Sequence, residues 1–507
     1  MSPFVYFRNL LVTILFICCS HFFLSAQSIG FSKTYLLENR STIFHAIRQI
    51  GNELFVLGQI GADTSGHSGV FIARMDTLGN IIKLRTFYDP LGQNNLELPI
   101  TSCETFITTN DKGFALSGST RFGKNIFLIK VDSTLDLQYF KEFPGEVKNT
   151  VPLYMINFLD AIYIIGFIQT LNFDFDNYIL KTDLEGNKVW EKFYGVPSLD
   201  ESAHSAYIND TLLTVLSSEG FDPNDAVYND EDSWNKFFTI DSSGVVKSTW
   251  RTMNKEEGFA AESLLKIGSN YYYITHPGIQ LSFNTLHYAP EIVCRDSLFN
   301  LKWKRTYGDT FYLNWFSNIV VGPDNFLYAA GYIPDGVTWG RVCKINPENG
   351  DLIWEARDTA FYIPGWGSRN RLEGLTVLPG GSVIAVGYTV DYAYHENGLL
   401  YKVTADGCID TLCSTVGIQE YIYVQQHKVK VYPNPAVDEI NFDVGDLKDL
   451  QLKLFSLQGQ KIIHQDLIAG NNKIKLDKNL TPGLYIWRVF SNNGYHIETG
   501  KILVLQN

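Results

Sequence analysis

The chain has 507 residues, of which 45% are hydrophobic and 14% aromatic, and it contains only four methionines. This length allows more than one globular domain, and the richness in aromatic residues favours β-structure. The formal net charge of −13 argues against nucleic acid or an anionic membrane as the main partner.

Residues 1–26 have the pattern of a secretory signal peptide. Arg8 precedes the apolar stretch 10–24, and the sequence LSA at 24–26 is a suitable cleavage site. The apolar stretch is shorter than the about 20 residues that a membrane-spanning helix needs. It contains two cysteines, so a lipoprotein signal is the alternative, but bulky residues stand before them. We expect a mature chain without a transmembrane segment that is secreted or lies at the cell surface.

A four-strand unit recurs seven times between residues 28 and 414. Two strands precede a third that usually ends in Asp, and the second of them usually carries a small residue near its end. A turn rich in Gly and Asn then leads to a fourth strand. The residues that end the third strands lie 50–58 positions apart and are Asp76, Asp132, Asp183, Asp241, Asp296, Asn346 and Thr404.

The seventh unit has no fourth strand of its own. The sequence GFSKTY at 30–35 has the spacing of a fourth strand, as in WEKFY at 190–194. We therefore predict an all-β fold, with a seven-bladed β-propeller at 28–414 whose N-terminal strand completes the last blade. A solenoid is the alternative, but it would need capping repeats and no matching N-terminal strand.

The repeats resemble those of secreted proteins of Bacteroidetes-type bacteria. The likeness is clearest in GFALSGST (113–120), which is followed by KVDSTLD (130–136), and in KTDLEGNKVWEKFYG (181–195). Units four, five and seven depart from this pattern. The resemblance implies no shared catalytic motif.

A connector at 415–428 leads to alternating strands at 429–507, which predict a small immunoglobulin-like β-sandwich of about seven strands. This stretch resembles the type A C-terminal sorting domain of the type IX secretion system. The resemblance implies export through the outer membrane, with the type IX translocon and a sortase-like peptidase as partners. An ordinary sandwich module is the alternative. The residues that carry the resemblance are Tyr432, Pro433, Asn434, Pro435, Phe455, Gly459, Pro482, Gly483, Leu484, Tyr485, Gly500 and Lys501.

Five cysteines remain outside the signal peptide, so at least one thiol stays unpaired within the chain. Only Cys408 and Cys413 are close in sequence. We predict a disulfide between these two, since an oxidising compartment permits it.

The order of antiparallel strands divides the connections between two faces. Connections from the second to the third strand, and from the fourth strand to the next unit, share one face and are long, whereas the others are tight turns. Loops on a rigid scaffold commonly carry binding residues, so the long-loop face is the predicted binding face. Aromatic side chains suit flat ligands and protein partners, although some could pack between blades. The candidate binding residues are Phe173, Trp234, Trp339, Trp366, Tyr392 and Tyr394.

Acidic residues in the long loop 219–233 suggest a Ca²⁺ site, with Asp222, Asp225, Asp230 and Asp232 as candidate ligands. Their spacing is not that of an EF-hand, and a solvated acidic loop is the alternative. No other cofactor is predicted.

The pair Asp174 and Asp176 raises the question of acid/base hydrolysis, but neighbouring acids in a polar loop are commonly surface groups. No nucleophile motif, metal signature or cofactor fingerprint supports catalysis. We therefore expect a non-catalytic module that binds an extracellular glycan or protein. The alternative is a secreted hydrolase or lyase that acts on polysaccharides or peptides.

Overall fold

The computed structural model describes residues 30–505, with gaps at 65, 100–103, 121–124, 145–148, 171–173, 197–198, 222–233, 253–261, 283–284, 309–313, 335–337, 359–368, 392–394, 410–428, 446, 449, 457–460, 478–479 and 492–495. The chain divides into two compact units, Met1–Ile418 and Gln419–Asn507. Both are built from β-strands, and the described part contains one short helical segment, η1 (Leu37–Asn39).

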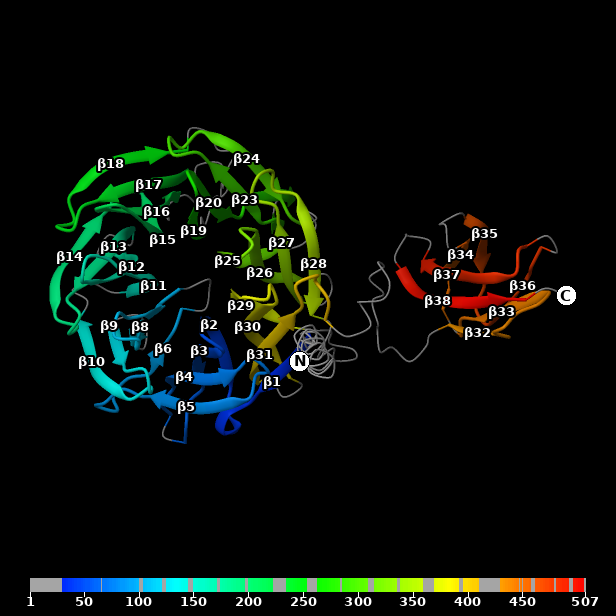
Figure 1. Ribbon diagram of the computed structural model, residues 1–507, viewed down its shortest axis with the longest axis horizontal. Helices are drawn as coiled ribbons and strands as arrows, with labels where there is room; N and C mark the ends of the chain where they lie inside the picture. The colour runs from blue at the N-terminus through cyan, green and yellow to red at the C-terminus, as the bar shows by residue number, and fades with distance from the viewer. Residues whose placement is uncertain are drawn as a thin grey trace, which may run out of the picture. The chain divides into compact units, whose positions relative to one another are not determined.

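The first unit is a ring of seven antiparallel sheets, the blades of a β-propeller (Figure 1). Blade one contains β2 (Thr42–Ile50), β3 (Glu53–Ile60), β4 (Gly69–Asp76) and β5 (Ile81–Phe87). Blade two contains β6 (Leu96–Glu97), β7 (Phe106–Thr108), β8 (Phe114–Thr120), β9 (Asn125–Val131) and β10 (Leu137–Pro144). Blade three contains β11 (Asn149–Asn157), β12 (Ile162–Gln169), β13 (Phe175–Thr182) and β14 (Lys188–Tyr194).

The next three blades follow the same order. Blade four contains β15 (Asp200–Asn209), β16 (Leu212–Phe221), β17 (Trp234–Ile240) and β18 (Val246–Arg251). Blade five contains β19 (Glu262–Ile267), β20 (Asn270–Thr275), β23 (Glu291–Arg295) and β24 (Leu301–Thr306). Between β20 and β23, where the sequence suggested only a loop, lies the hairpin of β21 (Gly278–Ser282) and β22 (Thr285–Tyr288). Blade six contains β25 (Trp315–Val321), β26 (Leu327–Pro334), β27 (Thr338–Ile345) and β28 (Leu352–Asp358).

The seventh blade joins the two ends of the ring. It contains β29 (Arg371–Val377), β30 (Val383–Val390), β31 (Glu396–Val403) and, as its outermost strand, β1 (Phe31–Tyr35). β1 pairs antiparallel with β31, with Phe31 opposite Lys402 and Tyr35 opposite Gly398. The predicted closure by the N-terminal strand is confirmed, and the solenoid is excluded.

The Asp that ends the third strand shapes the turn that follows it. Asp76 Oδ1 accepts the backbone N–H groups of Leu78 (2.9 Å) and Asn80 (2.8 Å), and Gly79 between them has a φ of 79°. This left-handed conformation suits glycine, which explains why the repeat reads Asp-x-x-Gly-Asn. Asp183 and Asn187 repeat the arrangement in blade three.

Aromatic residues in or just after the fourth strand attach several of the blades to the turn of the next one. The tyrosine hydroxyls of Tyr35, Tyr194 and Tyr307 donate to the carbonyl oxygens of Gly79 (2.6 Å), Gly244 (2.9 Å) and Gly350 (2.7 Å). The indole N–H groups of Trp190, Trp303 and Trp354 donate to those of Ser242 (3.3 Å), Pro347 (3.0 Å) and Ala405 (3.2 Å). These contacts give a physical reason for the Trp-x-x-x-Tyr spacing of the repeat.

The innermost strands approach the second strands closely. A Cβ on Gly166 would lie 1.9 Å from the carbonyl oxygen of Val151, and a Cβ on Gly331 would lie 2.0 Å from that of Trp315. The small residue predicted in the second strand is therefore required by this contact. Just beyond it the innermost strands contain a register shift, at Phe44/Ala46, Pro152/Tyr154, Ala203/Ser205, Phe316/Asn318 and Leu372/Gly374.

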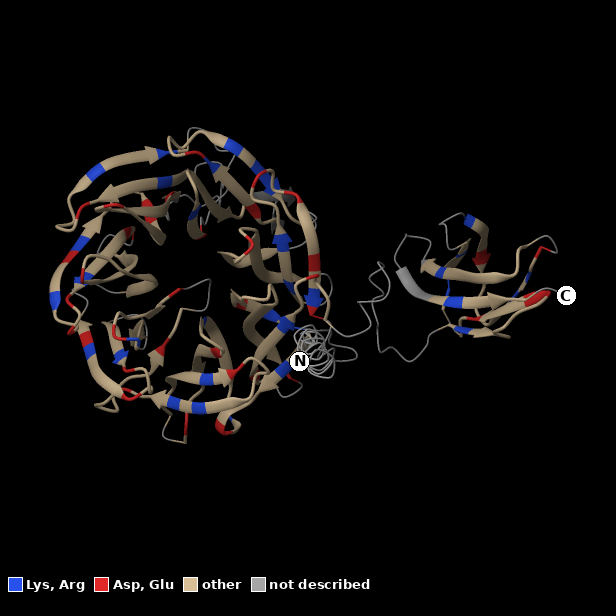
Figure 2. Cartoon of the chain, in the orientation of Figure 1, with Lys and Arg blue, Asp and Glu red and all other residues tan. Residues whose placement is uncertain are grey.

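Apolar side chains fill the spaces between blades. Between blades one and two, for example, Phe55 and Phe114 lie 4.4 Å apart between ring centroids, and Phe106 stacks on Phe114 at 5.2 Å. Charged residues lie along the strands and turns, with Lys and Arg frequent on outermost strands such as β5 and β24 (Figure 2).

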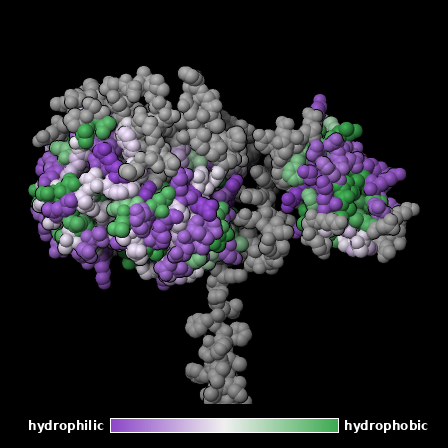
Figure 3. All heavy atoms as spheres, turned by 90° about the horizontal axis from the view of Figure 1, so that it is seen from above, coloured by the Kyte–Doolittle hydropathy of each residue, from purple (hydrophilic) through white to green (hydrophobic). Residues whose placement is uncertain are grey.

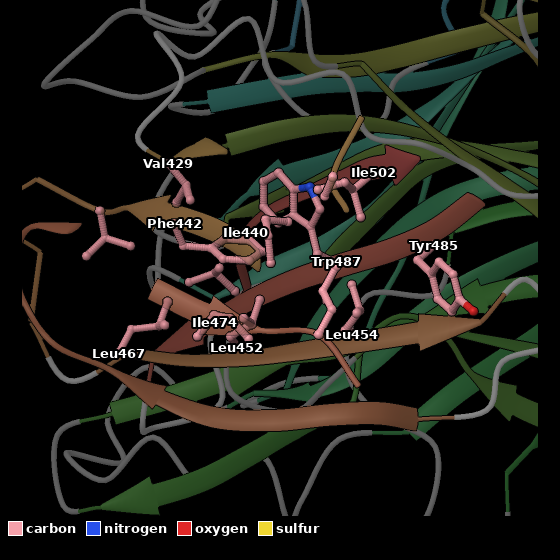
Figure 4. Packing of buried hydrophobic residues seen from close by; sticks show 14 of the residues in the cluster. Val429, Ile440, Phe442, Leu452, Leu454, Leu467, Ile474, Tyr485, Trp487 and Ile502 are labelled. Atoms are coloured by element: carbon pink, nitrogen blue, oxygen red, sulfur yellow. The ribbon is translucent and has the colours of Figure 1, made fainter. Parts of the chain in front are cut away.

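The second unit is a sandwich of two sheets. One contains β32 (Lys430–Tyr432), β33 (Glu439–Asp443) and β36 (Asn471–Lys475), and the other has the order β35 (Lys461–Leu467), β34 (Leu450–Ser456), β37 (Gly483–Ser491) and β38 (His496–Val504). Buried side chains from both sheets meet in one core, where Phe442 and Trp487 make an edge-to-face contact at 5.5 Å (Figure 4). The seven strands confirm the predicted small β-sandwich.

Candidate functional site at the long-loop face of the propeller

The two faces of the propeller differ as the strand order predicts. On one face, two-residue turns join Ile50 to Glu53, Asn209 to Leu212 and Ile267 to Asn270. On the other face, the connection between β16 and β17 takes up residues 222–233. The long connections therefore lie on the face opposite the two-residue turns, and this is the long-loop face.

Only two of the six predicted aromatic binding residues are described. Trp234 is the first residue of β17 and is half-buried. Trp339 in β27 is buried, with 8% of its surface exposed, which fits the alternative that some of these aromatic side chains pack in the core. Phe173, Trp366, Tyr392 and Tyr394 lie outside the described residues, as do Asp222, Asp225, Asp230 and Asp232.

Charged residues cross all four strands of blade four near this face. Glu201 on β15 and Glu219 on β16 are cross-strand partners, and the side chains of both are fully buried. Lys236 on β17 places its Nζ 3.6 Å from Glu201 Oε1 and 3.4 Å from Glu219 Oε1. Arg251 on the outer strand β18 makes a further ion pair with Glu219.

The adjacent end of blade three adds two more carboxylates. Asp176 lies on β13, and burial together with neighbouring Asp174 raises the pKa of its carboxyl group. Asp174 is 7% exposed, and its Oδ1 is buried without a hydrogen-bond partner among the described residues. Asp174, Asp176, Glu201, Glu219 and Lys236 are called the acidic seam below.

The acidic seam perturbs the titration of Glu201. Burial raises the pKa of its carboxyl group to about 8, against the opposing effect of Lys236, and the charges of Glu219 and Asp176 raise it further. The backbone N–H of Val196 donates to both carboxylate oxygens, at 3.1 and 3.2 Å. Glu201 therefore carries a proton at neutral pH, which limits the repulsion within the seam.

This arrangement predicts pH-dependent stability. The pKa of Glu201 is higher in the folded chain than its ordinary value of 4.5, so the folded state binds more protons between about pH 4.5 and 8. The free energy of unfolding should fall as pH rises through that window, by on the order of a few kcal/mol. Glu201→Gln keeps the shape without the ionisation, so it should remove this slope and be more stable than wild type at pH 8. Urea denaturation at pH 5, 6.5 and 8 measures the effect, with exposed Glu185→Gln as control. Equal slopes in both variants would contradict the assignment.

A second polar cluster, separate from the acidic seam, is centred on Glu104 and spans the centre of the ring. Glu104 lies two residues before β7, and its Oε1 accepts the amide of Asn318 of blade six at 2.8 Å. Arg48 of blade one lies 3.8 Å from the same oxygen. The backbone of Glu104 also pairs with blade three, because its N–H donates to Leu153 and its carbonyl accepts from Met155. Glu104 thus joins four blades at the centre of the ring.

The position of Glu104 follows from a departure of blade two from the repeat. Both β6 and β7 pair with β8, so the innermost strand of this blade is interrupted where other blades have a single bulged residue. Tyr154, whose pKa is raised by burial and by Glu104, hydrogen-bonds Ser205 of blade four. Ser205 in turn accepts the N–H of Leu264 of blade five. These hydrogen bonds link the innermost strands of blades three, four and five.

Aromatic and basic groups lie nearer the start of the innermost strands, which is the long-loop end. The Trp315 ring stacks on His276 with 3.6 Å between centroids and 6° between planes. Arg371, the first residue of β29, lies 4.7 Å from the ring centre of Tyr332. The sequence did not single out these residues because candidate binding residues were sought in loops. The available signal was a Trp or an Arg at the first position of the first strand of a blade.

The described residues contain no group of three or more His, Cys, Asp or Glu side chains arranged to hold a metal ion. No helix within that part of the chain has the length and apolar character to cross a membrane. Because the side chains of Glu201 and Glu219 have no exposed surface, neither can contact a substrate in this structure.

Cys294 and Cys343 are buried thiols that form no disulfide. Cys408 is described but Cys413 is not, so their bond stays a prediction.

In the C-terminal unit, several of the motif residues make structural contacts, and one of them, Asn434, holds its segment against the last strand, β38. Asn434 Nδ2 donates to the carbonyl of Lys501 (3.1 Å), and Asn434 Oδ1 accepts the N–H of Leu503 (2.9 Å). A Cβ at Gly500 would lie 2.3 Å from the Trp487 ring, so this position needs glycine. Tyr485 is buried, and its hydroxyl donates to the carbonyl of Thr481 at 2.6 Å. Gly459 lies outside the described residues.

Several solved structures are similar to part of the chain at low sequence identity. The β-propeller domain of the Trilobed protease from Pyrococcus furiosus is 10% identical, with a TM-score of 0.39, over 73% of this chain and 98% of that one. Quinohemoprotein alcohol dehydrogenase from Comamonas testosteroni is 10% identical, with a TM-score of 0.41, over 76% and 77%. Drosophila Plexin A in complex with Semaphorin 1b is 8% identical, with a TM-score of 0.41, over 74% and 88%. No curated protein matches the chain in sequence.

The C-terminal unit matches a family model. Residues 430–504 fit the model described as "Secretion system C-terminal sorting domain". The segment is the one that the Tyr-Pro-Asn-Pro, Pro-Gly-Leu-Tyr and Gly-Lys motifs indicated. The chain therefore ends in a type IX sorting domain, and the protein is one that the type IX machinery secretes or places on the cell surface.

Proposed function

We propose that the propeller is a non-catalytic module that binds an extracellular glycan or protein through its long-loop face. The observation that carries this proposal is the grouping of polar and aromatic residues at that end of the ring. The acidic seam, half-buried Trp234 and the Trp315–His276 stack all lie there. The opposite face consists of short turns whose backbone groups hydrogen-bond to one another.

The side-chain contacts at the centre of the ring restrict the kinds of ligand that the propeller can bind. Glu104 accepts a hydrogen bond from Asn318 of blade six and pairs with Arg48 of blade one, so these side chains meet across the ring. A ligand that threads the channel would have to break these contacts. An extended polymer or a protein surface lying across the face needs no such change, and aromatic side chains suit it.

A hydrolase or lyase is the second candidate, and one observation favours it. The pKa of Glu201 near 8 lies in the range that general acids use. Its complete burial between Lys236 and Glu219 weighs against that role, because a general acid must reach the substrate. Turnover assays on polysaccharides and peptides with wild type and Glu201→Gln separate the two candidates.

The two described tryptophans provide a matched test of binding. They occupy similar places near the start of third strands, but Trp234 is half-buried while Trp339 is 8% exposed. Trp234→Ala should weaken binding at least about ten-fold and change stability by about 1 kcal/mol or less, as is usual away from the core. Trp339→Ala should lower the free energy of unfolding by about 3–5 kcal/mol.

The measurement is a screen of glycans and extracellular proteins on the purified protein, followed by titration calorimetry with the best ligand. Thermal denaturation of each variant separates binding from folding. Full binding by Trp234→Ala and by Trp315→Ala would contradict a site at this face.

A further inference from the structure

One end of the outer face of the sheet β35-β34-β37-β38 in the sorting domain carries apolar side chains where polar ones would be expected. On β37, Tyr485, Trp487 and Val489 point into the core, so Leu484, Ile486 and Arg488 point outward. The same alternation turns Leu503 outward on β38 and Phe455 outward on β34. One face of an antiparallel sheet ordinarily meets water with polar side chains.

The outward apolar residues adjoin one another. Leu484 and Leu503 are cross-strand partners, and each is 38% exposed. In the neighbouring outward row, Ile486 lies opposite Phe455. Leu505, just beyond β38, is 45% exposed on the side of Leu503. We call Phe455, Leu484, Ile486, Leu503 and Leu505 the apolar face. Hydrophobic and hydrophilic surface residues lie side by side on the visible side of this unit (Figure 3).

Basic groups border the apolar face. Lys453, Arg488 and Lys501 are the charged residues at outward positions of β34, β37 and the described end of β38. Arg488 lies 5.9 Å from the ring centre of Phe455, and Lys453 lies 4.7 Å from that of Phe490. The positive charge is therefore held against the apolar side chains.

Two residues of the sorting motif turn their side chains outward on this face. Asn434, Tyr485 and Gly500 have structural tasks in hydrogen bonding or packing. Leu484 and Lys501 instead present exposed side chains. A motif residue with an exposed side chain that the core does not need is available for contact with the machinery that recognises the domain.

We propose that the apolar face with its basic border is the surface by which the type IX export machinery recognises this domain. The partner surface that fits it is an apolar patch bordered by carboxylates. Burial of the leucines supplies affinity, and Arg488 and Lys501 supply orientation. This inference rests on the sorting domain alone and does not depend on a ligand of the propeller.

The test is secretion of the full-length protein from a host with a working type IX system. The double variant Leu484→Ser with Leu503→Ser, and separately Arg488→Glu, should lower the secreted fraction at least about ten-fold, with periplasmic accumulation. The matched controls lie off the face: Ile468→Ser, which removes a 74% exposed apolar residue, and Lys475→Glu on the other sheet. Both controls should be secreted like wild type.

Folding and recognition are separated by measuring thermal denaturation of each variant purified from the periplasm. Lost secretion with an unchanged melting temperature supports the proposal. If the leucine double variant has a lowered melting temperature, the secretion of Arg488→Glu decides between a folding defect and lost recognition, because an exposed charge reversal leaves the core intact. Normal secretion of both face variants, or an equal loss in Ile468→Ser, would overturn the proposal.

Discussion

A chain that lacks residues 30–36 should lose about 5 kcal/mol or more of propeller stability and aggregate on heating. The deletion removes β1, which pairs over five residues with β31 in the seventh blade. It also removes the hydrogen bonds of Tyr35 to Gly79 and of Lys33 to the Leu78 carbonyl, which attach the last blade to the first. Each lost hydrogen bond costs about 1 kcal/mol, and the unpaired edge of β31 invites association with other chains.

Scanning calorimetry and light scattering measure this effect on the purified protein. The variant Tyr35→Phe is a control, because it keeps the strand and removes only the hydroxyl contact, so it should cost about 1 kcal/mol. A deletion variant that melts at the wild-type temperature would mean that β1 is not needed to close the ring.

Removal of residues 429–507 should abolish export beyond the periplasm, and the same segment fused to a reporter with a signal peptide should restore it. The reason is that the sorting-domain match and its compact core both lie within this segment. The predicted connector, 415–428, is where the chain should be cut. The amount of reporter in the medium, at the surface and in the periplasm gives the answer.

A fusion that carries Gly500→Val serves as the control for folding. The added side chain would meet the Trp487 ring, which a Cβ already approaches to 2.3 Å, so the sandwich core should be disrupted and the reporter retained. Periplasmic retention of the intact fusion in a host with a working type IX system would contradict the assignment of export to this segment.

The fold could be predicted from the sequence where one local pattern recurs. The turn capped by Asp76, the small residue at Gly166 and the strand 30–35 each reflect a contact that every blade repeats or needs. Local chemistry at fixed spacing was therefore enough to give the number of blades and the way the ring closes. The sorting domain could be predicted for the same reason, since several of its motif residues, such as Asn434, Tyr485 and Gly500, make its hydrogen bonds and core contacts.

The site was less predictable because it depends on register and on contacts between distant strands. Glu201 meets Glu219 only through the pairing of β15 with β16, and Lys236 joins them from a third strand. Glu104 reaches Asn318 across 214 positions of sequence, through an interruption that, among the described residues, blade two alone shows. Trp339 was a candidate binding residue of the long-loop face, but it lies in β27 and is buried. No local pattern carries this information.

The most direct test of the proposed binding face is hydrogen exchange on the exported protein with and without its ligand. We expect ligand to slow exchange at the long-loop ends of the strands, around Trp234, Trp315 and Arg371. The tight turns at 51–52, 210–211 and 268–269 should exchange at the same rate in both states. Slowed exchange at those turns, with none at the long-loop ends, would contradict binding at this face of the propeller.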